Sequence, residues 1–285
     1  MDEFDHLNQL SRSLGKYIII TFTFSWLFWL PSLLSSFQII PYEPIYNLLL
    51  VFGGFGPFVA SFSLTIKEGG KEGGIALWSK GWHCEKKLYL IISLTAIPIL
   101  CIIALLLANI FEGGTIFEYI DRYRSGYIFT EIFVMFFFSG PIQEEFGWRG
   151  YALYYLQSKF NAFESSLILG AIWSFWHYPL FLINGTALFN QNFYSYTISL
   201  LALSILFTWL NNNTNGSILA AIFFHTSINT TYSLFLYRIT PLGSIYFIIL
   251  LDVFMVTILA IFGQEKLKWS NRKKMNSIRL PKKTY

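Results

Sequence analysis

The sequence predicts an all-α integral membrane protein, a bundle of about eight transmembrane helices, and three observations support this. Apolar residues fill 54% of the 285 positions and aromatic residues 20%, whereas only 13% are charged. Ordinary soluble chains carry about 25% charged residues. The mean hydropathy is +0.51, and the apolar residues gather in runs of about 20, the length that crosses a hydrocarbon core of roughly 30 Å.

The expected spans, in chain order, are 17–39, 45–66, 88–110, 127–142, 165–183, 193–210, 217–235 and 243–263. After the second span, the segment "KEGGKEGG" (67–74) combines glycine with charge and predicts a flexible loop. The segment "NNNTNG" (211–216) predicts a turn by its asparagine and glycine content. Since no long linker divides the chain, residues 1–285 are expected to form a single polytopic membrane domain.

The distribution of basic residues predicts the orientation. Seventeen of the 20 lysines and arginines lie on one side of the predicted membrane, and Arg122, Arg124 and Arg238 lie on the other. Because cytoplasmic loops carry the excess of basic residues, both termini are expected in the cytosol. The Asn-, Lys- and Phe-rich composition is compatible with an AT-rich bacterial genome, so we expect a multi-pass protein of a bacterial plasma membrane.

The net charge of +4 does not indicate a nucleic-acid partner, because the basic residues follow this membrane pattern. The lipid bilayer is the expected partner. In particular, the basic cytosolic tail, residues 264–285, is expected to contact anionic headgroups.

Three groups of polar residues lie within these spans or at their ends. An ionisable side chain in such a place costs several kcal/mol and is a candidate for function. The groups are Glu144, Glu145 and Arg149 after the fourth span, His177 about twelve residues into the fifth, and His225 with Asn229 in the seventh.

The spacing within each group predicts which side chains meet. Glu145 and Arg149 are one helical turn apart and can pair on one face, whereas Glu144 projects about 100° away. His225 and Asn229 also share a face, as do Trp173 and His177. Taken singly, each group has an ordinary explanation: a solvated helix cap, a packed histidine, or a hydrogen bond between helices. Their occurrence together in a chain with four histidines favours a common site.

The same residues carry a family resemblance. "EEFGWR" (144–149) matches the motif EExxxR, "WSFWH" (173–177) matches FxxxH with Trp173 in place of Phe, and "HTSIN" (225–229) matches HxxxN. In these three motifs the chain resembles the CPBP family of intramembrane proteases. These are the CAAX proteases and bacteriocin-processing proteins, which include the Ras-converting prenyl endopeptidases. The resemblance covers residues 125–235, which we take as the catalytic core.

The resemblance implies an eight-helix bundle with an intramembrane cavity open to the cytosol. It implies that Glu144 is a general base, that His177 acts on the same water, and that His225 and Asn229 stabilise the oxyanion. Glu145, Arg149 and Trp173 would hold the site in shape. The family was long labelled as zinc metalloproteases, but a metal-free glutamate mechanism is favoured for relatives. No cofactor is therefore expected, and zinc held by Glu144, His177 and His225 is the alternative.

The residue chemistry agrees with this implication. Peptide hydrolysis needs a base for the water and donors for the developing oxyanion, and a carboxylate, two imidazoles and an amide supply both. The chain contains no HExxH motif of the common zinc proteases and no Gly-x-Ser-x-Gly nucleophile motif.

The leading hypothesis is thus an intramembrane endopeptidase acting on a membrane-associated peptide or protein, in CAAX-type processing or in bacteriocin maturation or immunity. A non-catalytic immunity or scaffold protein of the same fold is one alternative, against which the intact motifs argue. A proton-coupled transporter is another, although the sequence has no internal repeat.

Overall fold

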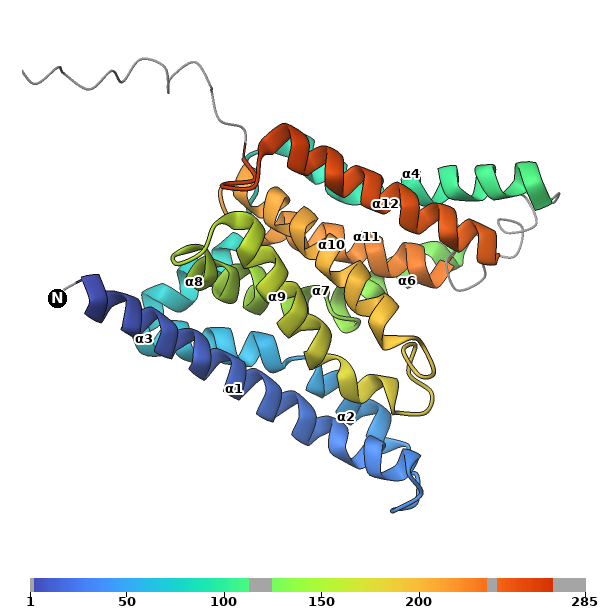
Figure 1. Cartoon of the computed structure of the whole chain (residues 1–285). Helices are drawn as coiled ribbons and strands as arrows, with labels where there is room; N and C mark the ends of the chain where they lie inside the picture. The colour runs from blue at the N-terminus through green and yellow to red at the C-terminus, as the bar shows by residue number, and fades with distance from the viewer. Residues whose placement is uncertain (1–2, 113–124, 235–239, 269–285) are drawn as a thin grey trace, which may run out of the picture.

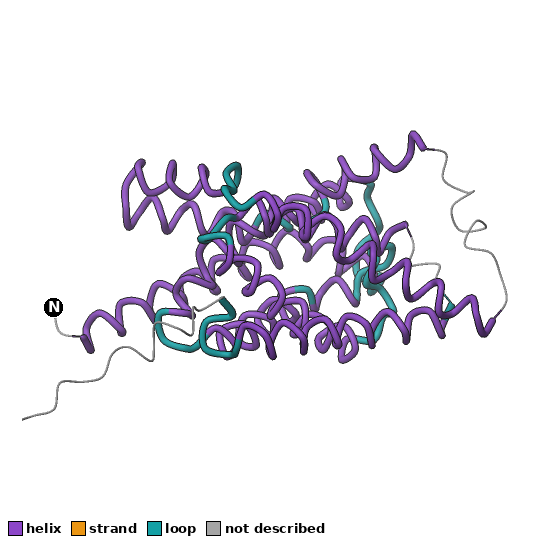
Figure 2. Tube along the Cα trace, turned by 90° about the horizontal axis from the view of Figure 1, so that it is seen from above, coloured by secondary structure: helices purple, strands orange, loops and turns teal. Residues whose placement is uncertain are grey.

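The structure, a computed structural model, describes residues 3–112, 125–234 and 240–268 (Figure 1). Within these three ranges the secondary structure is helical and no strand is present (Figure 2). The prediction of an all-α protein is therefore confirmed.

Three helices from the front of the chain form one side of the molecule. They are α1 (Glu3–Ser36), α2 (Ile45–Gly53) and α3 (Gly56–Lys80). The axes of α2 and α3 are bent by 46° relative to each other at their short break. Helix α1 packs against both, and the indole Nε1 of Trp29 donates to the Leu50 carbonyl at 2.9 Å. Gly53 permits this approach, because a Cβ there would lie 2.1 Å from the same Nε1.

Four helices form the opposite side. They are α4 (Lys87–Glu112), α10 (Phe193–Asn213), α11 (Ile218–Leu234) and α12 (Pro241–Phe262). Helix α4 packs against α11 and α12, and Figure 1 shows α4 and α12 lying across the molecule from α1.

Shorter helices fill the space between these two sides (Figure 1). They are α6 (Ser125–Phe138), α7 (Pro141–Gly147), the π-helical turn η1 (Trp148–Ala152), α8 (Leu153–Gln157), α9 (Ala162–Trp176) and the 3₁₀ turn η2 (Tyr178–Phe181). Helix α7 packs against α3 and α11, and α9 packs against α10. The three sequence motifs therefore lie on α7 with η1, on α9 and on α11.

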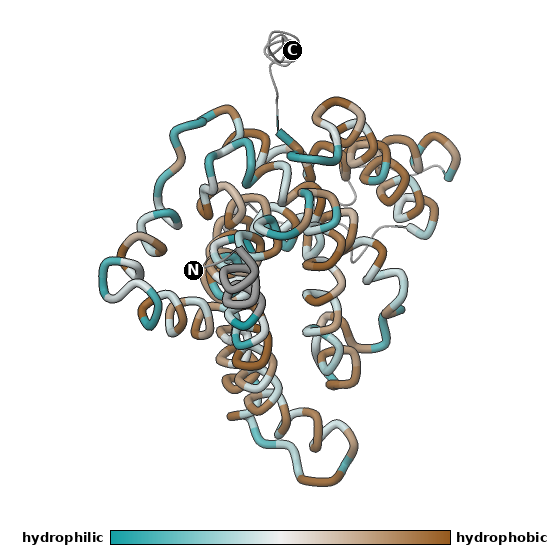
Figure 3. The backbone as a smooth tube through the Cα atoms, turned by 60° about the vertical axis from the view of Figure 1, so that its left-hand side comes forward, coloured by the Kyte–Doolittle hydropathy of each residue, from teal (hydrophilic) through white to brown (hydrophobic). Residues whose placement is uncertain are grey.

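The long apolar helices make the chain an integral membrane protein. By length and composition, four helices can cross a membrane: residues Arg12–Ser36 of α1, and all of α4, α10 and α12. The bent pair α2–α3 makes a fifth if it counts as one span. Large apolar side chains on these helices are exposed at the surface, among them Ile19, Ile91 and Val256. Figure 3 shows apolar colouring over much of the helical backbone. Such exposed apolar faces are what lipid contact requires.

The other three expected spans, 127–142, 165–183 and 217–235, coincide with shorter helices. Helix α6 has 14 residues, α9 has 15 and α11 has 17, fewer than the roughly 20 that a full crossing needs. The described residues thus give four or five spans by this measure, and the count of eight stays a prediction.

The prediction of a loop at "KEGGKEGG" is wrong, because this segment is part of α3. The Glu68 carboxylate accepts hydrogen bonds from Ser13 at 2.8 Å, Tyr151 at 3.0 Å and Tyr155 at 2.6 Å. These ties to α1, η1 and α8 hold the segment in place. The glycines provide only a kink, at Gly70, where φ is 64°.

The "NNNTNG" segment combines a helix end with the expected turn. Its first three residues close α10, and the turn follows at Asn215 (φ 57°) and Gly216 (φ 80°). The side chain of Asn213 donates to the Leu267 carbonyl at 2.7 Å, and that of Asn212 donates to the Lys266 carbonyl at 2.8 Å. The first residues of the basic tail are therefore fixed against the end of α10.

Candidate active site

A break between α6 and α7 sets up the site. Gly140 has a φ of 112°, which favours glycine, and Pro141 begins α7. The Gly140 N–H donates to the side-chain oxygen of Gln143 at 2.9 Å, and the Gln143 amide donates to the Val51 carbonyl at 3.0 Å. Since α7 starts here, Glu144 lies in its first turn.

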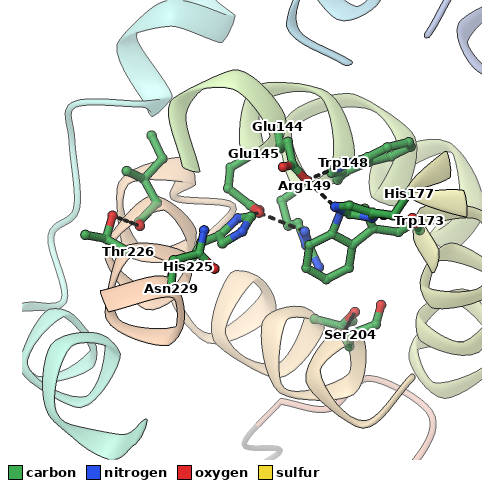
Figure 4. Close-up of polar contacts among 12 residues, drawn as sticks. Glu144, Glu145, Trp148, Arg149, Trp173, His177, Ser204, His225, Thr226 and Asn229 are labelled. Carbon is green, nitrogen blue, oxygen red and sulfur yellow. Dashed lines mark hydrogen bonds and ion pairs between the residues drawn. The ribbon is translucent and has the colours of Figure 1, made fainter. Parts of the chain in front are cut away.

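Glu144 is buried, and its two carboxylate oxygens have different surroundings (Figure 4). Oε2 accepts the indole N–H of Trp173 at 2.6 Å and that of Trp148 at 3.3 Å. Oε1 lies beside Gly140, where an added Cβ would come within 2.6 Å of it. The same Cβ would lie 3.3 Å from Nε2 of His225, so this nitrogen and Oε1 of Glu144 both lie close to Gly140.

The ion pair expected between Glu145 and Arg149 is present. Arg149 Nη1 lies 2.9 Å from Oε1 of Glu145, and both side chains are fully buried. The guanidinium carbon lies 3.7 Å from the ring centre of Phe207 and 4.3 Å from that of Trp173. Arg149 belongs to the π-helical turn η1, a rare element that often occurs at functional sites.

His225 is joined to this ion pair, a contact the sequence did not predict. Its Nδ1 lies 2.7 Å from Oε1 of Glu145, the oxygen that also accepts Arg149. A carboxylate that accepts from one ring nitrogen fixes the tautomer and the orientation of an imidazole. Because a carboxylate only accepts, Nδ1 carries the proton, and Nε2 faces the side of Gly140 and Glu144.

His177 lies directly after the end of α9, whereas the sequence predicted one continuous helix over 165–183. Helix α9 ends at Trp176, because Pro179 has no N–H to donate to the Phe175 carbonyl and cannot continue the α-helical hydrogen bonds. His177 Nδ1 is 2.8 Å from the Trp173 carbonyl. A carbonyl only accepts, so Nδ1 carries the proton and Nε2 is left as an acceptor.

Asn229 reaches the break between α6 and α7. Its side-chain amide donates to the Ser139 carbonyl at 2.6 Å. One of its two amide hydrogens thus holds the break in place, next to the glutamates that follow it.

The site also contains two residues that the sequence analysis did not select. Trp148 lies one turn after Glu144 within the first motif, and this spacing was the available signal. Gly140 precedes a proline, a pair typical of a break, but the closeness of Gly140 to Glu144 depends on the fold.

Comparison with known proteins identifies the family. A profile for the type II CAAX prenyl endopeptidase Rce1-like proteins matches residues 126–231, the part of the chain that carries all three motifs. The CAAX prenyl protease 2 of Methanococcus maripaludis is 30% identical over 233 residues, which covers 76% of this chain and 83% of that protein. The chain belongs to the Rce1-like CAAX prenyl endopeptidase family.

Membership in the Rce1-like family makes this chain a protease, and it is one embedded in a membrane. The enzyme prediction is therefore confirmed over the scaffold and transporter alternatives.

The described part of this Rce1-like protease brings together no group of three or more His, Cys, Asp or Glu side chains that could hold a metal ion. In particular, Glu144, His177 and His225 do not form such a set. The Trp173 ring lies 5.9 Å from that of His177 and 5.5 Å from that of His225, between ring centres. The donor geometry thus gives no support to the alternative zinc site.

Proposed function

We propose that this protease hydrolyses a peptide bond near the C-terminus of prenylated, CAAX-type proteins, using water activated by Glu144. The relative's name, CAAX prenyl protease 2, supports the substrate class. The observation that carries the mechanism is the difference between the two Glu144 oxygens: Oε2 accepts hydrogen bonds from two indoles, whereas Oε1 accepts from neither indole and lies close to Gly140.

In this proposal a water molecule lies against Oε1 of Glu144. Its oxygen attacks the carbonyl carbon of the scissile bond while one of its protons passes to Oε1. The tetrahedral intermediate then collapses, the C–N bond breaks, and the proton on Glu144 passes to the departing amine. His177 offers Nε2 as an acceptor that orients the same water.

The oxyanion needs donors at the point where its charge develops. His225 would serve as a donor in its doubly protonated form, with Glu145 accepting Nδ1–H and Nε2–H on the side of Gly140 and Glu144. The second amide hydrogen of Asn229 is the other donor. Glu145 and Arg149 take no part in proton transfer and hold His225 in position.

The mechanism needs no metal or other cofactor, since base and donors are all side chains. We also propose that the site opens to the cytosol, that both termini lie there, and that the protein resides in a bacterial plasma membrane. The positive-inside distribution of lysine and arginine supports the orientation.

Membrane vesicles test substrate and orientation together. A prenylated peptide ending in Cys-aliphatic-aliphatic-X should be cleaved after the prenylated cysteine by inverted vesicles, and the same peptide without the prenyl group should be cleaved far more slowly. Right-side-out vesicles should cleave it only after detergent opens them. Mass spectrometry of the products identifies the bond.

Cleavage of a bacteriocin leader peptide in preference to the prenylated peptide would contradict the substrate class. Equal cleavage by intact right-side-out vesicles would contradict the orientation alone.

A further inference from the structure

Trp173 is the most connected side chain of the site. It is buried, its ring contacts the guanidinium of Arg149 and both site histidines, and its Nε1 donates to Glu144 at 2.6 Å. This is the position at which the motif FxxxH has phenylalanine. A phenylalanine could keep the ring contacts but has no N–H to donate, so the hydrogen bond to Glu144 belongs to the tryptophan.

The two indoles act on one oxygen only. Both Trp148 and Trp173 donate to Oε2 of Glu144, from η1 and from α9. Hydrogen bonds to a carboxylate favour its ionised form and are stronger than bonds between neutral groups. They also fix the rotation of the carboxylate, because two donors from different helices meet on the same atom.

We propose that Trp173 is a positioning residue whose indole N–H, together with that of Trp148, holds Oε2 of Glu144 and so reserves Oε1 for the water. This inference rests on the proposed function of Glu144 as the base. The presence of Trp173 in place of the motif's phenylalanine then has a chemical effect: Glu144 stays ionised at a lower pH than it would beside phenylalanine.

Other groups around Glu144 also bear on its ionisation. Among the described residues, the titratable and charged side chains that lie near Glu144 include Tyr17 of α1, Glu145 of α7, Arg149 of η1, His177 after α9, Tyr196 of α10 and His225 of α11. Trp173→Phe changes none of these groups directly, so the effect of the indole N–H can be measured against a constant set of charges.

The test is the pH dependence of cleavage by purified Trp173→Phe protein. Loss of one donor to the carboxylate should shift the midpoint of the acid limb of kcat/KM upward by about one pH unit. At pH values below the midpoint of the limb, activity should then fall about tenfold. It should recover toward the wild-type level as the pH rises. KM should stay unchanged, because the lost hydrogen bond is made to Glu144 and not to the substrate.

Trp209→Phe is the matched control. Trp209 is also buried, and its Nε1 has no hydrogen-bond partner among the described residues. Its ring packs against Tyr89, Phe254 and Phe262. This variant should keep the wild-type pH profile, so any general cost of replacing a buried indole is seen separately.

An unshifted acid limb in Trp173→Phe, with activity lowered equally at every pH, would overturn the inference. If Trp173→Phe does not fold, Trp148→Phe is measured instead. Its acid limb should also move to higher pH, and an unshifted limb would overturn the inference. Full activity of Glu144→Gln would instead overturn the proposed function, so the two failures are distinguishable.

Discussion

Replacing Glu144 by glutamine should abolish cleavage while leaving the protein folded and abundant. Glutamine keeps the shape of the side chain, and its carbonyl oxygen can still accept the indole N–H groups of Trp148 and Trp173. It cannot take a proton from water at neutral pH. A positioned general base contributes roughly 10²–10⁴-fold to a rate, so the loss should fall in that range or beyond.

The measurement is cleavage of the prenylated peptide by purified Glu144→Gln protein, with its thermal stability recorded alongside. Glu164→Gln is the control, because Glu164 is an exposed carboxylate at the start of α9 that accepts the Asn161 N–H at 3.3 Å. The control should keep wild-type activity. Cleavage by Glu144→Gln at a rate within a few-fold of wild type would show that Glu144 is not the general base.

The second large effect is expected at the buried pair of Glu145 and Arg149. Removing one partner of such a pair leaves the other charge without compensation, at roughly 3–5 kcal/mol of unfolding free energy. Arg149→Met retains a long side chain between Phe207 and Trp173. Glu145→Gln should destabilise the protein more than Arg149→Met, because it removes the carboxylate partner of both Arg149 and the His225 ring.

A double-mutant cycle of Glu145→Gln and Arg149→Met, measured by thermal or denaturant unfolding in detergent, tests this pairing. The double variant should cost less than the sum of the two single variants, since Arg149 is no longer present in it to be left unpaired. Strict additivity would show that the two side chains do not depend on each other.

Much of the site was predictable from the spacing of residues along single helices. The pairing of Glu145 with Arg149 follows from one helical turn and needs no knowledge of the fold. The long spans α4, α10 and α12 were also predictable, because an apolar run of sufficient length is a direct consequence of the lipid solvent.

Tertiary contacts supplied what local spacing could not. The bond from His225 to Glu145 joins residues 80 positions apart, and no periodicity reports such a distance along the chain. The helical state of "KEGGKEGG" depends on the Glu68 carboxylate meeting two tyrosines from η1 and α8. Composition alone therefore favoured a loop. For His177, Pro179 was a local signal that α9 ends there, but the apolar run continued past it.

The central claim is that Glu144 activates water without a metal, and metal analysis of the purified active protein tests it most directly. After dialysis against a chelator, the protein should hold far less than one metal ion per chain and should cleave the prenylated peptide at its original rate. About one zinc per chain, whose removal abolishes cleavage and whose return restores it, would contradict the claim.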